Sequence, residues 1–345
     1  MRQVKPVKVG DCTLDGKHIY IQSMLNTRSD DIEGSAAQAA ALEQAGCEII
    51  RAAIPNRDAI VLIPAIKERI HIPLVADIHF DYRLALEAAA AGIDKIRINP
   101  GNIGGMDRVR AVVKACQERS IPIRIGVNSG SLEKEILAKY GAPTAEALVE
   151  SAMGHVRMLE ACDFDNIVIS MKSSDVNTMI EAYRLCARQC HYPLHLGVTE
   201  AGTERMGLIK SAIGIGTLLH DGIGETIRVS LTEDPVKEIK AARDILKCIG
   251  KRGGPQIVSC PTCGRTRIDL VKTAKEVEAA LENVDKDIKV AVMGCVVNGP
   301  GEAREADIGI AGGDGCAMLF RKGTVLRKVA EEDIVPELMA EIEKL

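Results

Sequence analysis

The first 250 residues repeat one hydrophobic pattern eight times: a short run rich in aliphatic and β-branched residues, then a longer segment in which alanine and leucine recur at helical spacing. This alternation is typical of parallel βαβ units. The predicted strands are 19–24, 48–54, 73–80, 95–100, 122–128, 166–172, 193–200 and 226–232. The predicted helices between them include 34–45, 82–91, 106–119, 204–219 and 234–248. Eight such units in about 230 residues match a (β/α)₈ TIM barrel, an α/β fold.

The pattern changes after Ile249, where Gly-Lys-Arg-Gly-Gly-Pro follows at 250–255. Glycine and proline at this density cannot continue a helix, and they mark a domain boundary. We therefore expect a barrel domain at 1–250, a linker at 251–256 and a smaller α+β domain at 257–345. In the second domain the pattern predicts a helix at 269–281, strands at 289–293 and 307–311, and a terminal helix.

Polar side chains occupy inward positions of several predicted barrel strands. Successive side chains of a strand point to opposite faces, and the inward set of a barrel is usually a branched aliphatic core. In the strand at 95–100, Ile96 and Ile98 face the helices, so Arg97 turns inward. The same parity turns further polar residues inward, namely Arg51, Arg124, Asn128, Ser170, Lys172, Arg228, Ser230 and Thr232.

The five inward cations need anionic partners, because unpaired buried charges are strongly unfavourable. One possibility is pairing with the inward carboxylates Asp77 and Glu200. Two carboxylates cannot balance five cations, so a bound diphosphate, which fits guanidinium groups in a bidentate manner, is the favoured partner. The inward pairs Asp77 with His79 and Thr199 with Glu200 are candidates for acid–base catalysis or for orienting hydroxyl groups.

The overall composition limits the partners of the chain. A formal charge of −4 and a pI near 6.0 give no support for nucleic acid or an anionic membrane as a partner. No apolar run approaches the ~18 residues of a membrane span, and the N-terminal residues lack the apolar stretch of a secretion signal. We therefore expect a cytoplasmic protein that binds neither membrane nor nucleic acid.

The chain has 11 cysteines, and in a reducing cytosol this number indicates metal binding or buried thiols rather than disulfides. Most of them lie among apolar residues without a partner at ligand spacing. These predicted packing thiols are Cys12, Cys47, Cys116, Cys162, Cys186, Cys190 and Cys248.

The other cysteines suggest a metal centre in the second domain. Cys260 and Cys263 have the two-residue spacing that suits zinc or an iron–sulfur cluster, and Cys295 opens a glycine-rich segment that reaches Glu302. A structural zinc site could take Cys316 as its fourth ligand. However, no second Cys-x-x-Cys accompanies the first, and Glu302 offers a displaceable fourth ligand to a [4Fe–4S] cluster held by three thiolates. Such a cluster would be catalytic as well as electron-carrying.

Seven segments, in order along nearly the whole chain, carry a family resemblance: QSM at 22–24, DIHF at 77–80, RINPGN at 97–102, RIGVN at 124–128, GVTEAG at 197–202, SCPTCGRT at 259–266 and GCVVNGPGEA at 294–303. Together they resemble the 4-hydroxy-3-methylbut-2-enyl diphosphate synthases, in their two-domain bacterial form. The resemblance implies the methylerythritol phosphate route to isoprenoids. It also implies reductive ring opening and dehydroxylation of 2-C-methyl-D-erythritol 2,4-cyclodiphosphate.

The resemblance further implies a role for each candidate residue. The ligands of the [4Fe–4S] cluster would be Cys260, Cys263, Cys295 and Glu302. The diphosphate would be clamped by Arg51, Arg97, Arg124 and Lys172. Further contacts in the mouth of the barrel would come from Arg228, Ser230, Asn128, Asp77 and Glu200. The expected electron donor is flavodoxin or ferredoxin.

Two other functions fit parts of the pattern. One is a pterin-type transferase barrel with an attached zinc module, since such barrels also bind diphosphate esters. The other is a non-enzymatic iron–sulfur electron carrier or sensor. The glycine-rich turn with Glu302 argues against both, because neither function needs a displaceable ligand.

The order of elements predicts an assembly. The strand at 226–232 runs toward the catalytic mouth, so the helix at 234–248 must run back to the opposite face of the barrel. That helix is roughly 20 Å long, and the linker at 251–256, at ~3.3 Å per residue, could barely return along it. We therefore expect a head-to-tail homodimer in which each cluster domain caps the barrel of the partner.

Overall fold

The eight predicted barrel strands are all present, and they pair in parallel in the order β8-β7-β6-β5-β4-β3-β10-β9. A parallel bridge between Ile169 and Leu194 joins β8 to β9 and closes the ring. The strands are β3 (Tyr20–Met24), β4 (Ile49–Ala53), β5 (Leu74–Asp77), β6 (Lys95–Ile98), β7 (Ile123–Asn128), β8 (Ile167–Lys172), β9 (His195–Leu196) and β10 (Thr226–Ile227). The first unit is therefore a TIM barrel.

This computed structural model describes residues 2–282, 284–297 and 304–345. The chain divides into two compact units, Met1–Ile249 and Gly250–Leu345. No helix of the described residues is long and apolar enough to cross a membrane.

The last two barrel strands are much shorter than the predicted ranges 193–200 and 226–232. Beyond Leu196 the chain leaves the sheet, and Glu200 has a φ of 50°, a left-handed conformation that no strand accommodates. The N–H of Arg228 still donates to the carbonyl of Leu196 on β9, but further along the chain the N–H of Thr232 donates to the carbonyl of Gly202, outside the sheet. As a result Arg228 and Ser230 are carried on a loop at the mouth rather than on a strand.

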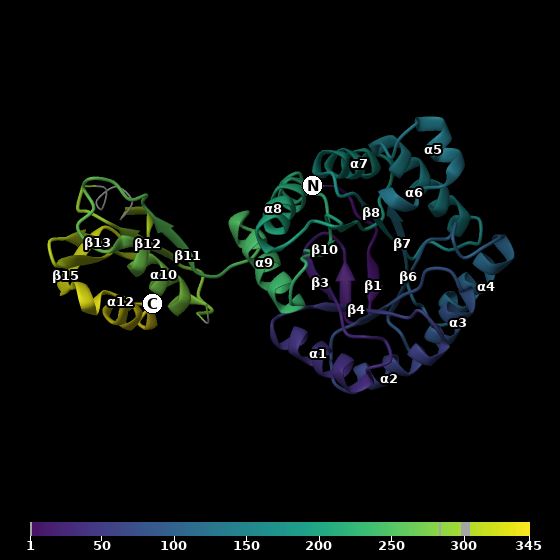
Figure 1. The fold of residues 1–345 in the computed structure, drawn as a ribbon, viewed down its shortest axis with the longest axis horizontal. Coiled ribbons are helices and arrows are strands. Elements are labelled where there is room, and N and C mark those ends of the chain that lie inside the picture. Colours follow the sequence, from purple (N-terminus) through teal and green to yellow (C-terminus); the bar gives the residue numbers. More distant parts are fainter. Residues whose placement is uncertain (1, 283, 298–303) are drawn as a thin grey trace. The chain divides into compact units, whose positions relative to one another are not determined.

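Helices surround the barrel strands, as Figure 1 shows. They are α1 (Ile32–Gln44), α2 (Leu62–Lys67), α3 (Tyr82–Ala90), α4 (Met106–Gln117), α5 (Lys134–Tyr140), α6 (Ala145–Glu160), α7 (Val176–Gln189), α8 (Glu204–His220) and α9 (Pro235–Cys248). Side-chain caps fix several starts: Asp81 accepts from a backbone N–H of α3, Asp175 from one of α7 and Asp234 from one of α9. In α9, Pro235 follows the cap as the first helical residue. The backbone N–H at this position has no partner within a helix, so proline loses no hydrogen bond there.

The main apolar core lies between the strands and the helices. Ile96 and Ile98 of β6 are completely buried, together with Val109 and Val112 of α4. The outward parity predicted for β6 is therefore confirmed, and it leaves the inward positions free for polar side chains.

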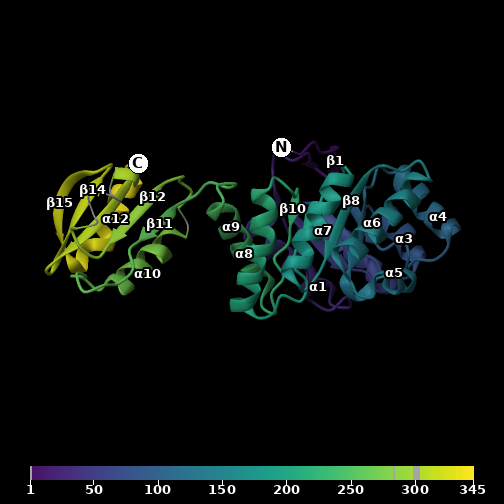
Figure 2. The same cartoon turned by 90° about the horizontal axis from the view of Figure 1, so that it is seen from above.

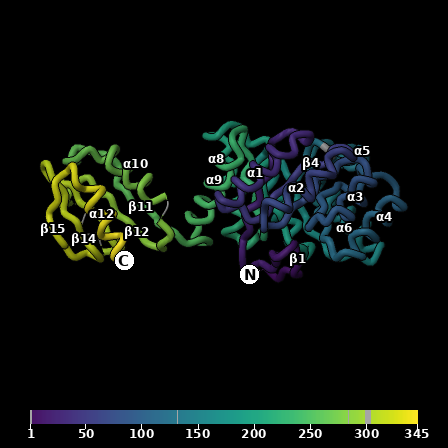
Figure 3. The backbone as a smooth tube through the Cα atoms, turned by 90° about the horizontal axis from the view of Figure 1, so that it is seen from below, coloured from purple at the N-terminus to yellow at the C-terminus, as the bar shows by residue number. Residues whose placement is uncertain are grey.

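An antiparallel hairpin covers the N-terminal end of the barrel. It consists of β1 (Val7–Val9) and β2 (Cys12–Leu14), and its apolar side chains pack against Ile49, Val75 and Val168 near the beginnings of barrel strands. Figures 2 and 3 both show this N-terminal segment at one end of the barrel. The hairpin covers that end of the barrel, and the mouth lies at the other end, where the strands end.

The second unit is a five-stranded mixed sheet in the order β11-β12-β13-β14-β15. Its strands are β11 (Gln256–Ser259), β12 (Lys289–Met293), β13 (Ile308–Gly313), β14 (Cys316–Arg321) and β15 (Thr324–Ala330). The first three are parallel, and the last two return antiparallel. Helices α10 (Leu270–Leu281) and α12 (Ile334–Glu343) pack against the sheet through Val277 and Leu338. The α+β prediction is confirmed, although β11, β14 and β15 were not predicted.

A buried tyrosine ties α7 to the barrel wall. The hydroxyl of Tyr183 donates to the carbonyl of His195 on β9 and accepts the N–H of Met171 on β8 at 3.0 Å. In the described residues, the one bridge at this junction pairs Ile169 of β8 with Leu194, which directly precedes β9. Tyr183 therefore supplies hydrogen bonds at the weakest seam of the sheet.

We predict that Tyr183→Phe lowers the free energy of unfolding of the barrel by about 1–3 kcal/mol, because two buried backbone groups lose a partner. Urea unfolding followed by circular dichroism would measure the change. Tyr140→Phe is the matched control, since the hydroxyl of Tyr140 donates to the side chain of Glu150 and not to a backbone group. Equal effects of the two substitutions would contradict the role assigned to Tyr183.

Candidate functional site

The inward cations line one cavity of about 260 Å³ at the mouth of the barrel. The residues around it are Arg51, Asp77, His79, Arg97, Arg124, Asn128, Ser170, Lys172, Thr199, Arg228 and Ser230. Seven strands or the loops that follow them contribute to this set. The structure thus brings together the residues that sequence reasoning assigned to the substrate, except Glu200, which does not line this cavity.

Strand register explains why these side chains meet. Arg97 on β6 lies opposite Asp77 on β5 and opposite Arg124 on β7. Asn128 and Lys172 are likewise partners at the ends of β7 and β8. Inward residues at one level of a parallel barrel converge, so period-two alternation is sufficient to gather them.

A second cavity of about 370 Å³ adjoins the first and shares His79, Arg97, Asn128 and Thr199 with it. Its other lining residues are Phe80, Asn99, Asn102, Gly126, Ser129, Gly130 and Glu200. The two cavities are therefore one mouth with a strongly cationic part and a part lined by amides, hydroxyls and one exposed carboxylate. Glu200 belongs to the second part and makes no ion pair with the inward arginines of the described structure.

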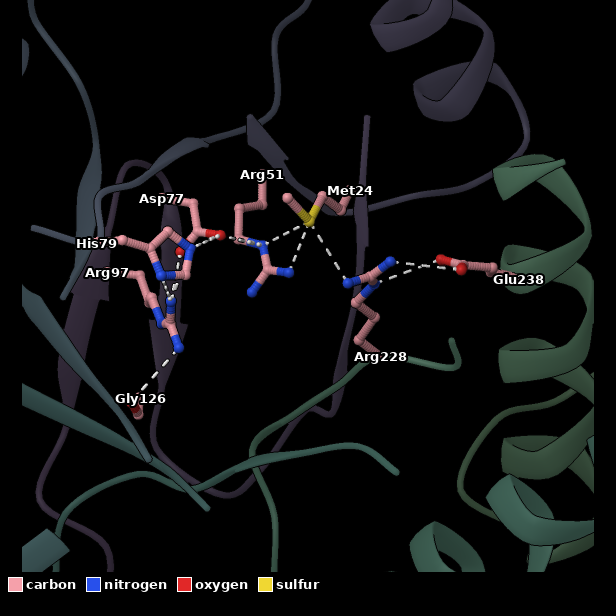
Figure 4. A network of polar contacts seen from close by, with 8 residues as sticks. All are labelled: Met24, Arg51, Asp77, His79, Arg97, Gly126, Arg228 and Glu238. Atoms are coloured by element: carbon pink, nitrogen blue, oxygen red, sulfur yellow. Dashed lines mark hydrogen bonds and ion pairs between the residues drawn. The ribbon is translucent and has the colours of Figure 1, made fainter. Parts of the chain in front are cut away.

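Asp77 is the main counter-charge of the mouth (Figure 4). Its carboxylate lies 3.0 Å from Arg97 Nη1, 3.8 Å from Arg51 Nε and 3.3 Å from His79 Nε2. Burial alone would raise the pKa of Asp77, but Arg51, His79 and Arg97 together hold it well below its usual range. Asp77 is therefore ionised at neutral pH, and it orients the guanidinium groups.

Glu238 on α9 is a second counter-charge that sequence reasoning did not identify. Its carboxylate lies 3.4 Å from Arg228 Nε, and it also accepts from Ser23 Oγ at 3.0 Å and from the N–H of Leu231 at 3.0 Å. The strand pattern instead offers Glu200 as the second inward carboxylate. Glu238 lies on a helix, outside the strand alternation from which the inward residues were read, so that pattern could not reveal it.

Two guanidinium groups of the mouth have a thioether as an acceptor. Arg51 Nε lies 3.1 Å and Arg228 Nη1 lies 3.5 Å from Met24 Sδ (Figure 4). A thioether is a weak acceptor, whereas guanidinium groups pair strongly with carboxylate or phosphate oxygens. Burial lowers the pKa of Arg51 to about 10, which leaves it charged at neutral pH. The arginines therefore retain unused capacity for an oxygen anion.

A sixth inward cation, Lys95, was missed by sequence reasoning although it has the same strand parity as Arg97. It is completely buried one inward position below Arg97, and its Nζ has no hydrogen-bond partner in the described structure. Burial and the nearby Arg124 lower its pKa well below the usual range. Arg124 also has two buried nitrogens, Nε and Nη1, without a partner there. Six basic side chains thus face two carboxylates, Asp77 and Glu238, in the described barrel interior.

The cysteines of the second unit meet at one edge of its sheet. Cys260 directly follows β11 and Cys295 follows β12, and these strands are parallel neighbours. The N–H of Gly294 donates to Cys260 Sγ at 3.3 Å, a contact that links the two loops. Cys263 is exposed in the turn after Cys260, and the backbone N–H of Arg265 lowers the pKa of its thiol. Parallel strands therefore bring the cysteine-bearing loops together across a gap of more than 30 residues in sequence.

The remaining candidates of this centre are less defined. Glu302 lies outside the described residues, so its predicted ligand role stays a prediction. Cys316 begins β14 opposite Gly313, at the end of the hairpin with β13. No group of three or more Cys, His, Asp or Glu side chains lies in metal-binding arrangement in the described ranges.

These observations define a class of protein. It combines a TIM barrel that has a cationic mouth with an α+β domain in which two cysteine-bearing loops meet. The GcpE TIM-barrel domain matches residues 4–243, and the GcpE protein C-terminal domain matches residues 256–344. The chain belongs to the GcpE family.

Relatives of nearly equal length support this assignment. The chain is 61% identical to a 4-hydroxy-3-methylbut-2-en-1-yl diphosphate synthase (flavodoxin) of Clostridium perfringens, with 100% of this chain and 99% of the relative aligned. It is 58% identical to the protein of the same name from Geobacillus kaustophilus, with 99% and 92% aligned. The predicted resemblance is confirmed, and these names favour it over the transferase and electron-carrier alternatives.

Solved structures resemble the barrel alone. Dihydropteroate synthase of Xanthomonas albilineans covers 72% of this chain with a TM-score of 0.52 and 15% identity, and 99% of its own chain is aligned. The type I 3-dehydroquinate dehydratase of Clostridium difficile covers 72% with a TM-score of 0.51 and 15% identity, and 98% of its chain is aligned. At this identity the likeness concerns the fold only.

We predict that Gly126→Ala weakens the binding of inorganic pyrophosphate by roughly tenfold to a hundredfold, about the value of one charge-assisted contact. A Cβ on Gly126 would lie 2.2 Å from Arg97 Nε, so the guanidinium must leave its place beside Asp77. Calorimetric titration would measure the affinity. Gly154→Ala, whose Cβ would meet only Arg157 Nη2 at 3.9 Å, is the matched control. Unchanged affinity in Gly126→Ala would show that Arg97 does not contact the anion.

Proposed function

We propose that this chain is a 4-hydroxy-3-methylbut-2-enyl diphosphate synthase, the activity named for its relatives. It is an iron–sulfur oxidoreductase of the methylerythritol phosphate route to isoprenoids. It opens the ring of 2-C-methyl-D-erythritol 2,4-cyclodiphosphate and removes a hydroxyl group reductively. The reducing cytoplasm suits its 11 cysteines, which are all free thiols.

The observation that carries this proposal is the uncompensated charge of the mouth. Four arginines and Lys172 line a cavity in which Asp77 is the one lining carboxylate of the described residues. A diphosphate supplies the missing negative charge and bidentate acceptors for the guanidinium groups. Arg51, Arg97, Arg124 and Lys172 therefore bind the diphosphate, and Arg228, Ser230 and Asn128 contact the substrate beside it.

The two predicted acid–base carboxylates take different roles in this proposal. Asp77 holds Arg51 and Arg97 in position and remains ionised, so it does not deliver protons. Glu200 lies in the wider, less cationic cavity, where the carbon skeleton of a substrate anchored by its diphosphate would extend. Glu200 is therefore the candidate for proton transfer to that skeleton.

The second unit is suited to a [4Fe–4S] cluster. The Cys260 sulfur accepts a backbone N–H, an arrangement that stabilises thiolate ligands of clusters, and Cys295 lies one residue beyond the donor Gly294. Cys260, Cys263 and Cys295 would hold the cluster, with Glu302 as fourth ligand. When bound, the cluster supplies electrons to the substrate. The names of the relatives include flavodoxin, so flavodoxin is the proposed electron donor.

We predict that Cys295→Ser abolishes cluster retention, because a hydroxyl is a poor substitute for a thiolate toward iron. Iron and acid-labile sulfide analysis of anaerobically purified protein would measure it. Cys316→Ser is the matched control and should keep the full iron content. A full complement of iron and sulfide in Cys295→Ser, or bound zinc that requires Cys316, would contradict the cluster assignment.

The course of α9 is the basis for proposing a homodimer. Glu238, in its first turn, contacts Arg228 at the mouth. Arg243, further along the helix, lies against Gly46, just before β4 begins at the opposite end of the barrel. The chain thus leaves the barrel far from its mouth, and the linker at 251–256 is short. A cluster domain that caps the mouth of the partner's barrel, in a two-fold head-to-tail dimer, meets this constraint.

An apolar surface on the barrel fits such an assembly. Met206, Leu208, Ile209 and Ile213 of α8 are exposed, and Val236 at the start of α9 is exposed as well. Exposed apolar side chains that gather in a patch are typical of protein–protein contacts. Two copies related by a two-fold axis can cover this surface with each other.

We predict that subunits with complementary defects restore activity. A Cys295→Ser subunit and an Arg97→Ala subunit are each inactive alone, but a mixed dimer that caps in trans contains one intact site. Turnover after subunit exchange would measure the recovery, with tagged subunits to verify that mixed dimers form. No recovery despite verified mixed dimers would contradict capping in trans.

A further inference from the structure

Lys172, like Arg124, has no ion-pair partner among the described residues of the mouth. It ends β8, is 7% exposed and lines the cationic cavity. In the described ranges its Nζ has no ion pair and no hydrogen bond, whereas Arg51 and Arg97 pair with Asp77 and Arg228 pairs with Glu238. The backbone at Gly197 approaches so closely that a Cβ there would lie 2.9 Å from Nζ. The side chain is thus confined within the cavity.

The groups that face Lys172 are mostly cations. The charged or titratable residues around the cavity are Arg51 on β4, Asp77 on β5, His79 after β5, Arg97 on β6, Arg124 on β7, Arg228 after β10 and, in the adjoining cavity, Glu200 after β9. His195 on β9 is buried and also interacts electrostatically with Lys172. Burial lowers the pKa of Lys172 well below its usual range, and Arg228, Arg51, Arg124 and Arg97 lower it further. An ammonium group at this place would be a buried charge repelled by four neighbours.

We propose that Lys172 is an uncharged amine in the free barrel and takes up a proton when the diphosphate binds. This inference rests on the proposed function, since a substrate anion in the cavity is what reverses the local charge. Lysine suits the role because its amine loses a proton readily when buried, whereas guanidinium groups stay charged. The barrel thus completes its cationic site only in the presence of the ligand.

The proposal determines the sign of a pH effect. The anion raises the pKa of Lys172, so the complex binds more protons than the free protein. By linkage, affinity then falls as pH rises through the window between the free and the bound pKa values, by up to tenfold per pH unit. Below and above this window, the protonation of Lys172 does not make the affinity depend on pH.

The ionisation of the substrate does not interfere with this measurement. Each phosphorus of a cyclic diphosphate carries only one strongly acidic oxygen, so the ligand does not titrate near neutral pH, unlike a phosphate monoester with its second ionisation near pH 6. Protons exchanged on binding therefore belong to the protein. A measurement at about pH 8 also lies above the range in which an ordinary imidazole titrates.

The test is calorimetric titration of the anaerobically purified full-length protein with 2-C-methyl-D-erythritol 2,4-cyclodiphosphate, without electron donor. Runs in Tris and in Hepes, which differ in ionisation enthalpy, give the number of protons taken up. We expect uptake of up to one proton per site in the unmodified protein. Lys172→Arg, which stays charged, and Lys172→Gln, which stays neutral, should both bind without uptake, and their affinities should not vary with pH in this window.

Lys95→Met is the matched control, because Lys95 is also buried among cations but does not line the cavity. It should keep the uptake of the unmodified protein. Binding without uptake, uptake that persists in Lys172→Arg, or uptake lost in Lys95→Met would each overturn the assignment to Lys172. No binding of the cyclodiphosphate at all would overturn the proposed function, and this inference with it.

Discussion

The constraint on which the rest of this structure depends is excess positive charge inside a barrel. TIM barrels usually fill their interior with branched aliphatic side chains, which stabilise the fold. Here Lys95, Arg97 and Arg124 occupy inward positions of β6 and β7, and further cations follow around the ring. Asp77 and Glu238 neutralise only part of this charge within the described residues. Without an anion, the buried positive charges in the interior are therefore unfavourable. A bound anion would neutralise them and make their burial favourable.

The fold tolerates this interior because its apolar core lies elsewhere. Outward residues of the same strands, such as Ile96 and Ile98, pack against the helices and are completely buried. The hairpin β1–β2 closes the N-terminal end with further apolar contacts. Stability and ligand binding thus belong to opposite faces of the same strands, and period-two alternation keeps the two sets apart. Such separation allows strong electrostatics at the site without loss of the core.

Both units use the same geometric rule to assemble chemistry. In the barrel, Asp77 and Lys172 are the last residues of parallel strands β5 and β8. In the second unit, Cys260 and Cys295 follow the parallel neighbours β11 and β12. Carboxyl ends of parallel strands meet at one edge, so residues distant in sequence converge there without any local motif. The two halves of the proposed reaction, anion binding and electron supply, are each built in this way.

The sequence by itself determined the architecture and most of the members of the cationic site. Eight alternating units predict the barrel, and strand parity alone identifies Arg51, Arg97 and Arg124 as inward. Both features are periodic patterns along a short stretch of chain, so they do not depend on how the strands pair. The tertiary structure decided how these charges are balanced. Glu238 reaches Arg228 from α9, and Glu200, placed by a left-handed turn, stays apart from the arginines. The pairing of carboxylates with cations depends on contacts between elements that are far apart in the chain. Such contacts produce no periodic pattern in the sequence.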